Sequence, residues 1–255
     1  QKTPLQVRGF NKKGQFIKLV DAEFSVEGAG EVKDGVFIAK GDKSSQVAII
    51  TAKVGDLTGT AKARVIPPLP WTFDFEDGKV PPTWIGASYR HQPTEFQGDK
   101  VLVKISTIPK GTRSQAWMGW TNLHDYTVQA DFYPTESNGK VPSMGLIAQR
   151  YTLDMTNKQE LQIRSWTSRV ELRFAKTVPF AWTPNQWYTM KFQASNENGA
   201  AVLRGKVWKR GEKEPDGWMI EAADEVPNVV GSPGLFGNAT DAPFYIDNVR
   251  VTPNK

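Results

Sequence analysis

Residues Tyr126–Tyr133 read YTVQADFY, in which apolar or aromatic side chains alternate with polar ones. Successive side chains of a β-strand point to opposite faces, so this period of two predicts a strand with one buried face. The pattern recurs between residues 71 and 255, in Met144–Tyr151, Glu160–Trp166, Arg169–Phe174, Trp187–Ala194, Ala201–Lys209 and Phe244–Val251. We find no convincing amphipathic helix among them. Seven or more long strands without helices predict a jelly roll of two sheets.

The first 66 residues predict shorter strands separated by glycine-containing turns. These strands are expected at Gln15–Val20, Asp21–Val26, Gly35–Ala39, Gln46–Lys53 and Gly59–Ile66. Their spacing is typical of a small β-sandwich. The stretch Pro67-Pro68-Leu69-Pro70 then predicts a stiff linker. We therefore expect a domain at 1–66, a linker at 67–70 and a second domain at 71–255.

The composition excludes several classes of site. The 255 residues include no cysteine, which excludes disulfides, cysteine-ligated zinc, iron–sulfur clusters and thiol catalysis. The two histidines, His91 and His124, are too few for a histidine-rich metal centre. Both lie near predicted turns in polar surroundings, so we expect both on the surface.

The charge of the chain is uneven along its length. Residues 1–70 hold 11 basic and 7 acidic residues, whereas residues 71–255 hold 21 and 20. No dense cluster of lysine and arginine is present, so we expect no nucleic-acid partner. No run of 18 apolar residues is present either, so we expect no transmembrane helix.

Two groups of motifs resemble known families. The stretches AEFSVEGAGEVKDGVFIA (Ala22–Ala39) and AIITAKVGDLTGTAKARV (Ala48–Val65) resemble bacterial Ig-like domains. The stretches FDFEDG (Phe73–Gly78), QWYTMK (Gln186–Lys191) and YIDNVRV (Tyr245–Val251) resemble concanavalin-like lectin and glucanase jelly rolls of the LamG-like kind. The resemblance implies an Ig-like β-sandwich followed by a concanavalin-like jelly roll.

The order of these two parts, joined by RVIPPLPW, resembles the C-terminal region of bacterial envelope proteins that begin with a PQQ-like β-propeller. That resemblance implies a periplasmic, cell-surface or secreted location and other domains of a longer chain as partners. The sequence contains no propeller blade, so the cofactor chemistry of such propellers does not transfer.

The catalytic motif of the enzyme branch is missing. Retaining glucanases of this fold carry Glu-x-Asp-x-x-Glu or Glu-x-Asp-x-Glu on one strand, which sets two carboxylates about 5–5.5 Å apart. No glutamate here completes that spacing. Glu160 and Glu171 belong to separate predicted strands and keep a glycoside hydrolase or lyase open as an alternative.

The resemblance also implies a structural calcium site. In many sugar-binding jelly rolls of this kind, acids near the first and last strands hold Ca²⁺. The corresponding residues here are Asp74, Glu76 and Asp247, and Ca²⁺ takes six to eight oxygen ligands. The alternative is that these acids form hydrogen bonds in turns.

A surface for carbohydrate is predicted from the alternation of Glu160–Trp166. Leu161 and Ile163 should face the core, whereas Glu160, Gln162, Arg164 and Trp166 should face outward. Aromatic rings stack on sugar C–H faces, and planar polar groups bind hydroxyls. We add Gln149 and Tyr151, which would share one side of the strand Gly145–Tyr151, and Trp117. The alternative is a solvated face with a salt-bridged arginine.

Three functional hypotheses follow. The first is a non-catalytic module that binds a glycan or polysaccharide. The second is a structural or assembly module that binds no glycan. The third is the glycoside hydrolase or lyase named above.

Overall fold

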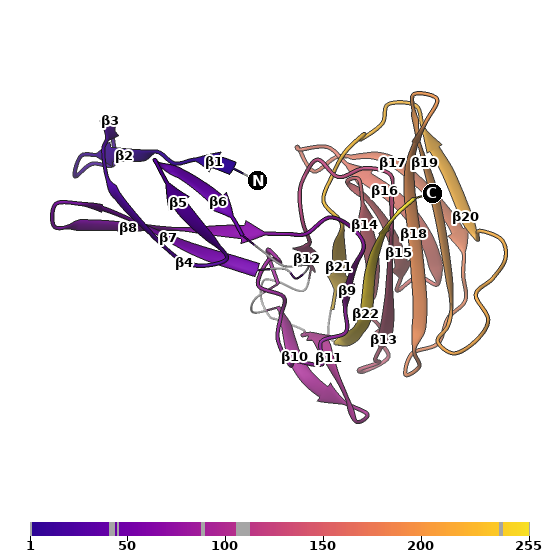
Figure 1. The fold of residues 1–255 in the computed structure, drawn as a ribbon. Coiled ribbons are helices and arrows are strands. Elements are labelled where there is room, and N and C mark those ends of the chain that lie inside the picture. The colour runs from indigo at the N-terminus through magenta and orange to yellow at the C-terminus, as the bar shows by residue number, and fades with distance from the viewer. Residues whose placement is uncertain are drawn as a thin grey trace. The chain divides into compact units, whose positions relative to one another are not determined.

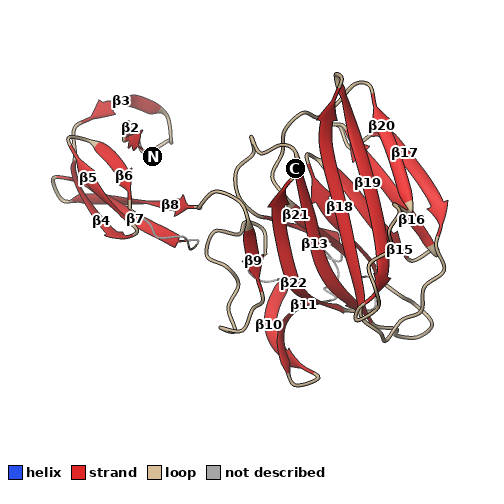
Figure 2. Ribbon diagram, turned by 45° about the vertical axis from the view of Figure 1, so that its right-hand side comes forward, coloured by secondary structure: helices blue, strands red, loops and turns tan. Residues whose placement is uncertain are grey.

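The computed structural model describes residues 2–40, 44, 46–87, 90–105, 113–239 and 242–254. In this part of the chain the regular elements are all strands, so the predicted all-β class is confirmed (Figure 1, Figure 2). The chain divides into two compact units, Gln1–Pro68 and Leu69–Lys255. None of the described residues form a helix long and apolar enough to cross a membrane.

The smaller unit is a β-sandwich of two three-stranded sheets with an added hairpin. One sheet has the order β1 (Lys2–Pro4), β6 (Val36–Ala39), β5 (Gly30–Lys33). The other has the order β4 (Glu23–Gly28), β7 (Gln46–Val54), β8 (Leu57–Val65), and the hairpin is β2 (Val7–Phe10) with β3 (Phe16–Val20). Phe37 of β6 packs with Ala48 and Ile50 of β7, so the two sheets share one core. Membership of the Ig-like family stays a prediction.

The larger unit consists of an eight-stranded and a six-stranded sheet. The eight-stranded sheet has the order β10 (His91–Phe96), β11 (Asp99–Lys104), β22 (Phe244–Pro253), β13 (Tyr126–Pro134), β18 (Tyr188–Glu197), β19 (Ala200–Lys209), β20 (Ile220–Asp224), with β9 (Trp71–Phe73) also paired to β22. The six-stranded sheet has the order β12 (Arg113–Trp117), β21 (Gly234–Asn238), β14 (Ser143–Ala148), β15 (Tyr151–Thr156), β16 (Glu160–Trp166), β17 (Leu172–Pro179). Figure 2 shows β13, β18, β19 and β22 side by side in one layer and β15–β17 in the other.

The core of the larger unit lies between these two sheets. The six-stranded sheet contributes side chains that are fully buried, among them Leu146, Leu153, Leu161 and Ile163. The eight-stranded sheet contributes Val128, Phe132, Phe192 and Leu203, which are buried to the same degree. At Gly205 of β19 a Cβ atom would lie 2.7 Å from Cδ2 of Leu153 on the opposite sheet. The two layers therefore interlock, and the outer face of each sheet is left for other contacts.

One predicted strand is a hairpin instead. Met144–Tyr151 was expected to run straight, but β14 ends at Ala148 and β15 begins at Tyr151. Ala148 pairs with Tyr151, and the two residues between them, Gln149 and Arg150, both have positive φ. A two-residue hairpin turn of the I′ type requires positive φ at both positions. The alternation of the sequence continues through this turn, although the chain reverses there.

Two smaller expectations are also corrected. The strand predicted at Arg169–Phe174 begins only at Leu172, because Thr167 accepts a backbone hydrogen bond from Val170 and closes a turn. His91, expected on the surface, is fully buried on β10, where it pairs with Lys104 of β11. His124 has an exposed side chain, as expected.

Candidate functional site

Strand β16 places its side chains alternately inside and outside the larger unit. Leu161, Ile163 and Ser165 are buried, whereas Gln162 and Arg164 are half-buried on the outer face and Trp166 is 36% exposed. The alternation predicted from ELQIRSW is therefore present in the structure. The outer face of the six-stranded sheet carries the polar and aromatic set.

A groove of about 580 Å³ lies on that outer face. Its lining includes residues from four of the six strands: Gln115 and Trp117 of β12, Phe236 of β21, Thr152 of β15, and Arg164 and Trp166 of β16. The lining also includes Ile85, Gly86 and Arg90, which precede the hairpin of β10 and β11. The volume lies within the roughly 300–1,000 Å³ that is usual for small-ligand sites.

Two glycines lie beside groove residues in the six-stranded sheet. The register aligns Gly145 of β14 with Phe236 on one side and with Asp154 on the other. A Cβ at Gly145 would lie 2.8 Å from the Oδ1 atom of Asp154, so the missing side chain leaves space for this carboxylate. Gly234 pairs with Trp117, and a Cβ there would lie 3.2 Å from the Trp117 ring. The glycines let the larger side chains lie close to the sheet.

Arg164 is held from three directions. Its Nε atom forms an ion pair with Oδ2 of Asp154, and the two side chains are 12% and 2% exposed. Its guanidinium carbon lies 4.8 Å from the centroid of the Phe236 ring and 5.6 Å from that of Trp166. Neither terminal amino group donates a hydrogen bond to another described residue. The arginine is thus fixed in place, with donors left for a ligand.

The groove contains three of the residues predicted for sugar binding, Trp117, Arg164 and Trp166. Gln162 lies on the same face but outside the groove, and donates a 2.9 Å hydrogen bond to Oγ1 of Thr177. Glu160 stands at the start of β16 beside Thr156. Gln115, Phe236 and Arg90 also line the groove, and the sequence did not predict them as site residues. The alternation of RSQAW (Arg113–Trp117) would have predicted that Gln115 shares a face with Trp117.

Gln149 and Tyr151 are not part of the outer face. Because the chain reverses at Gln149-Arg150, Tyr151 shares the inner face with Ala148, and both Gln149 and Tyr151 are fully buried. Oε1 of Gln149 accepts a 2.7 Å hydrogen bond from the backbone of Asp125, and its amide nitrogen donates to Asn196. The prediction that these two side chains share one side of a single strand is therefore wrong, and neither lies on the outer face with the groove residues.

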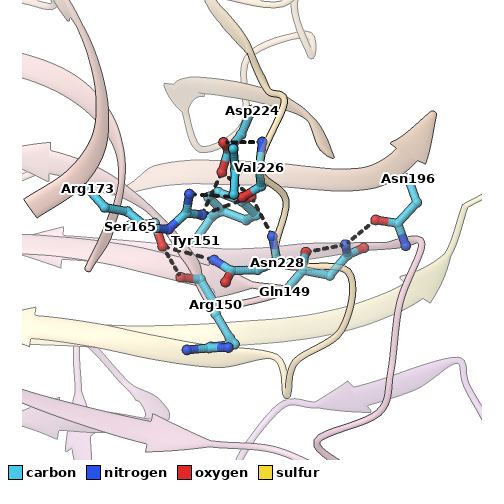
Figure 3. A network of polar contacts seen from close by, with 9 residues as sticks. All are labelled: Gln149, Arg150, Tyr151, Ser165, Arg173, Asn196, Asp224, Val226 and Asn228. Carbon is cyan, nitrogen blue, oxygen red and sulfur yellow. Dashed lines mark hydrogen bonds and ion pairs between the residues drawn. The ribbon is translucent and has the colours of Figure 1, made fainter. Parts of the chain in front are cut away.

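Both residues instead form hydrogen bonds with the loop between β20 and β21 (Figure 3). The Tyr151 hydroxyl donates a 2.6 Å hydrogen bond to Asp224 and accepts one from the backbone of Asn228. Burial and the Asp224 carboxylate raise the pKa of Tyr151 to about 12. Asn228 also donates to Ser165, the neighbour of Trp166 in sequence. The network thus connects the loop to the strand that carries the groove residues.

Tyr151→Phe is expected to reduce the free energy of unfolding by about 1–3 kcal/mol, because the Asn228 amide and Asp224 each lose a buried partner. Urea unfolding monitored by fluorescence measures this change. The control is Tyr133→Phe, since the Tyr133 hydroxyl makes no hydrogen bond to another described residue. Equal stability of the two variants would show that the hydroxyl of Tyr151 is not needed by the loop.

The residues predicted as calcium ligands lie near one another in the fold. Strand β9 pairs with β22, so the segment with Asp74 and Glu76 approaches Asp247, as the sequence predicted for first and last strands. Asp247, however, accepts a 3.3 Å hydrogen bond from the Arg210 guanidinium, which also lies 3.6 Å from Asp131 and 3.7 Å from Asp99. Desolvation raises the pKa of Asp247 to about 6.

These contacts do not fit a calcium centre. An arginine already supplies the positive charge among the acids, and Asp74 and Glu76 are exposed. No three acidic or histidine side chains of the described residues converge as metal ligands do. The calcium site stays a prediction of the resemblance.

The carboxylates kept open for catalysis are far apart. Glu160 begins β16, whereas Glu171 follows the turn after its last residue, Trp166. A strand rises about 3.3 Å per residue, so the length of β16 separates them by roughly 20 Å. Paired carboxylates of glycosidases stand at most about 9.5 Å apart. Glu160 and Glu171 therefore do not form such a pair.

Comparisons with known proteins give a fold likeness only. No family model and no curated protein matches the chain. Among solved structures, lectin II from Ulex europaeus is 11% identical, with a TM-score of 0.45, over 73% of this chain and 99% of the lectin. A Bacillus subtilis protein of unknown function with a galectin-like fold is 12% identical, with a TM-score of 0.44, over 68% of this chain and 90% of its own.

An enzyme resembles the fold of this chain about as closely as these two proteins do. The Crh5 transglycosylase, solved in complex with NAG, is 9% identical, with a TM-score of 0.43, over 73% of this chain and 84% of the enzyme. At these values the likeness adds nothing to the sandwich architecture already described.

Proposed function

We propose that the larger unit is a non-catalytic module that binds carbohydrate in the groove on its six-stranded sheet. The observation that carries the proposal is the arrangement of Trp117 and Trp166 in one groove, with the fixed guanidinium of Arg164 beside Trp166. Aromatic rings present apolar faces for sugar C–H groups. Arg164, Gln115 and Thr152 supply hydrogen-bonding groups for hydroxyls.

The non-catalytic part of the proposal is supported by the groove lining. Among the described residues that form it, none is an aspartate or a glutamate. General acid–base or nucleophilic cleavage of a glycoside needs two carboxyl groups in most families. We extend the proposal to the setting suggested by the sequence: the smaller sandwich is an Ig-like spacer, and the module works in the envelope or outside the cell.

Trp166→Ala is expected to weaken binding of a glycan identified on an array by about 30-fold, since truncating a well-packed aromatic anchor costs about 2 kcal/mol. Calorimetry with the soluble glycan measures this loss, and the melting temperature shows that the variant is folded. The control is Trp208→Ala, a half-buried tryptophan on β19 of the other sheet, which should bind normally.

The rival hypotheses predict different results. A purely structural module binds no glycan on the array, and this outcome would remove the proposal. A hydrolase or lyase releases soluble sugar from the bound polymer over time, and a sugar-reducing-end assay detects it. Binding that is unaffected by Trp166→Ala and by Trp117→Ala would place the site elsewhere and contradict the assignment of the groove.

A further inference from the structure

The groove is rich in hydrogen-bond donors and poor in acceptors. Its described lining includes two arginines, Arg90 and Arg164, and no acidic residue. Arginine donates through up to five N–H groups and accepts none. The acceptors of the lining side chains are the amide oxygen of Gln115 and the hydroxyls of serine and threonine. A ligand with more acceptors than donors matches this lining better than a ligand that carries hydroxyls alone.

The contacts of Arg164 leave the outer edge of its guanidinium, formed by the two terminal amino groups, open to a planar anion. Asp154 takes the Nε atom, and the rings of Phe236 and Trp166 lie within cation–π distance. The two terminal amino groups form the outer edge of the guanidinium and have no hydrogen bond within the described chain. Two parallel N–H bonds from such an edge match the two oxygens of a carboxylate.

The groove offers aromatic surface beside the arginine that would hold the anion. Trp166 stands next to Arg164, and Trp117 lies in the same groove, so a charged sugar and its neighbours in a polymer each have an aromatic surface within the site.

We propose that the ligand of this groove is an acidic polysaccharide built from hexuronic acids, with a sugar carboxylate bound by Arg164. This inference rests on the proposed function and narrows it to one class of ligand. The carboxylate is bound end-on by the terminal amino groups of Arg164, and Arg90 adds longer-range attraction. The pyranose rings on either side stack on the tryptophans.

The experiment compares each polymer with its own uncharged form. Polygalacturonate, polymannuronate and polyglucuronate are titrated by calorimetry, together with the carboxyl-reduced product of each, at low and high salt. We expect at least one polyuronate to bind at least tenfold more tightly than its reduced form. The preference should shrink at high salt, because salt screens charge pairs.

A matched pair of variants assigns the preference to the groove. Asp154→Asn combined with Arg164→Gln removes both charges of the pair and should lose most of the preference for the charged polymer over its reduced form. Arg250→Gln removes an exposed arginine on β22 of the other sheet and should keep the preference. Melting temperatures confirm that both variants are folded.

The outcomes separate this inference from the proposed function. Equal binding of a polyuronate and its reduced form, or Trp166-dependent binding of neutral glycans only, would overturn the uronate inference and leave carbohydrate binding standing. A sulfated galactan that binds as tightly as the best polyuronate would overturn the choice of carboxylate. Binding to none of the polyuronates and to no glycan on the array would overturn both proposals.

Discussion

The His91→Leu variant is expected to lose about 3 kcal/mol less of its free energy of unfolding than the wild type when the pH falls from 6.5 to 4. His91 is fully buried, and neither ring nitrogen has a hydrogen-bond partner among the described residues. Desolvation, and then the positive charges of Lys104 and Arg90, lower its pKa from 6.5 to about 3. The folded protein therefore resists protonating this ring.

The direction of the pH dependence follows from proton binding. Below pH 6.5 the unfolded chain takes up a proton at His91 that the folded chain does not, so stability falls as the pH falls toward 3. Each pH unit in this window is worth about 1.4 kcal/mol, which gives about 3 kcal/mol between pH 6.5 and pH 4. Leucine has no titrating group, so the variant lacks this loss.

The wild-type profile alone would hide the effect. Asp247 has a pKa raised from 3.8 to about 6, chiefly by desolvation, so its contribution to stability falls as the pH rises between those values. The contributions of His91 and Asp247 oppose each other in that window. The informative quantity is the difference in unfolding free energy between wild type and His91→Leu, measured by urea unfolding at several pH values.

The control is His124→Gln, which removes the other histidine, whose side chain is 59% exposed. It shows what the loss of an exposed histidine does over the same pH range. A constant difference between wild type and His91→Leu would mean that the His91 ring gains a proton in the folded state without cost, and that it is open to water.

The position of His91 also shows where a sequence pattern stops being informative. In strand β10, HQPTEF, the histidine begins the strand and a proline follows two residues later. The neighbouring residues are polar, which suggested a surface. The burial comes from pairing with β11, and Lys104 opposite His91 is buried as well. Because both buried residues of this pair are polar, the sequence contains no apolar pattern that would predict their burial.

The groove shows the same limit in a different form. The period of two in ELQIRSW was sufficient to predict that Arg164 and Trp166 share the outer face, because alternation within one strand is a local property. Phe236 of β21 completes the support of Arg164, yet it is separated from Arg164 by two intervening strands in the sheet. Neighbours across a sheet depend on strand order, which the alternation does not contain.

The hairpin at Gln149-Arg150 accounts for the largest error in the sequence prediction, which expected one continuous strand there. Turns with two positive φ values are usually made by Asn-Gly or similar pairs. Here Gln149 adopts the conformation while its side chain bonds to Asp125, Asn196 and the loop after β20. Tertiary contacts hold a turn that the local sequence does not favour. One unrecognised turn was enough to assign Gln149 and Tyr151 to the wrong face.

Arg164→Gln is expected to lower the free energy of unfolding by about 3–5 kcal/mol, because it removes the guanidinium that forms an ion pair with the nearly inaccessible Asp154 carboxylate. Breaking a buried ion pair from one side costs more than removing the whole pair, since the remaining charge has lost both water and its counter-charge. Adding Asp154→Asn should therefore restore most of the lost stability. Denaturant unfolding of the two single variants and the double variant forms the required cycle.

Lys213→Gln provides the control, because Lys213 and Asp216 form an ion pair in which both side chains are more than 80% exposed. Water solvates such a pair in either state, so the variant should unfold like the wild type. If Arg164→Gln also unfolded like the wild type, the ion pair with Asp154 would contribute nothing to stability, and it would not fix Arg164 in the groove. The stability cycle thus tests the preorganisation on which recognition of a sugar carboxylate depends, without requiring that any ligand be known.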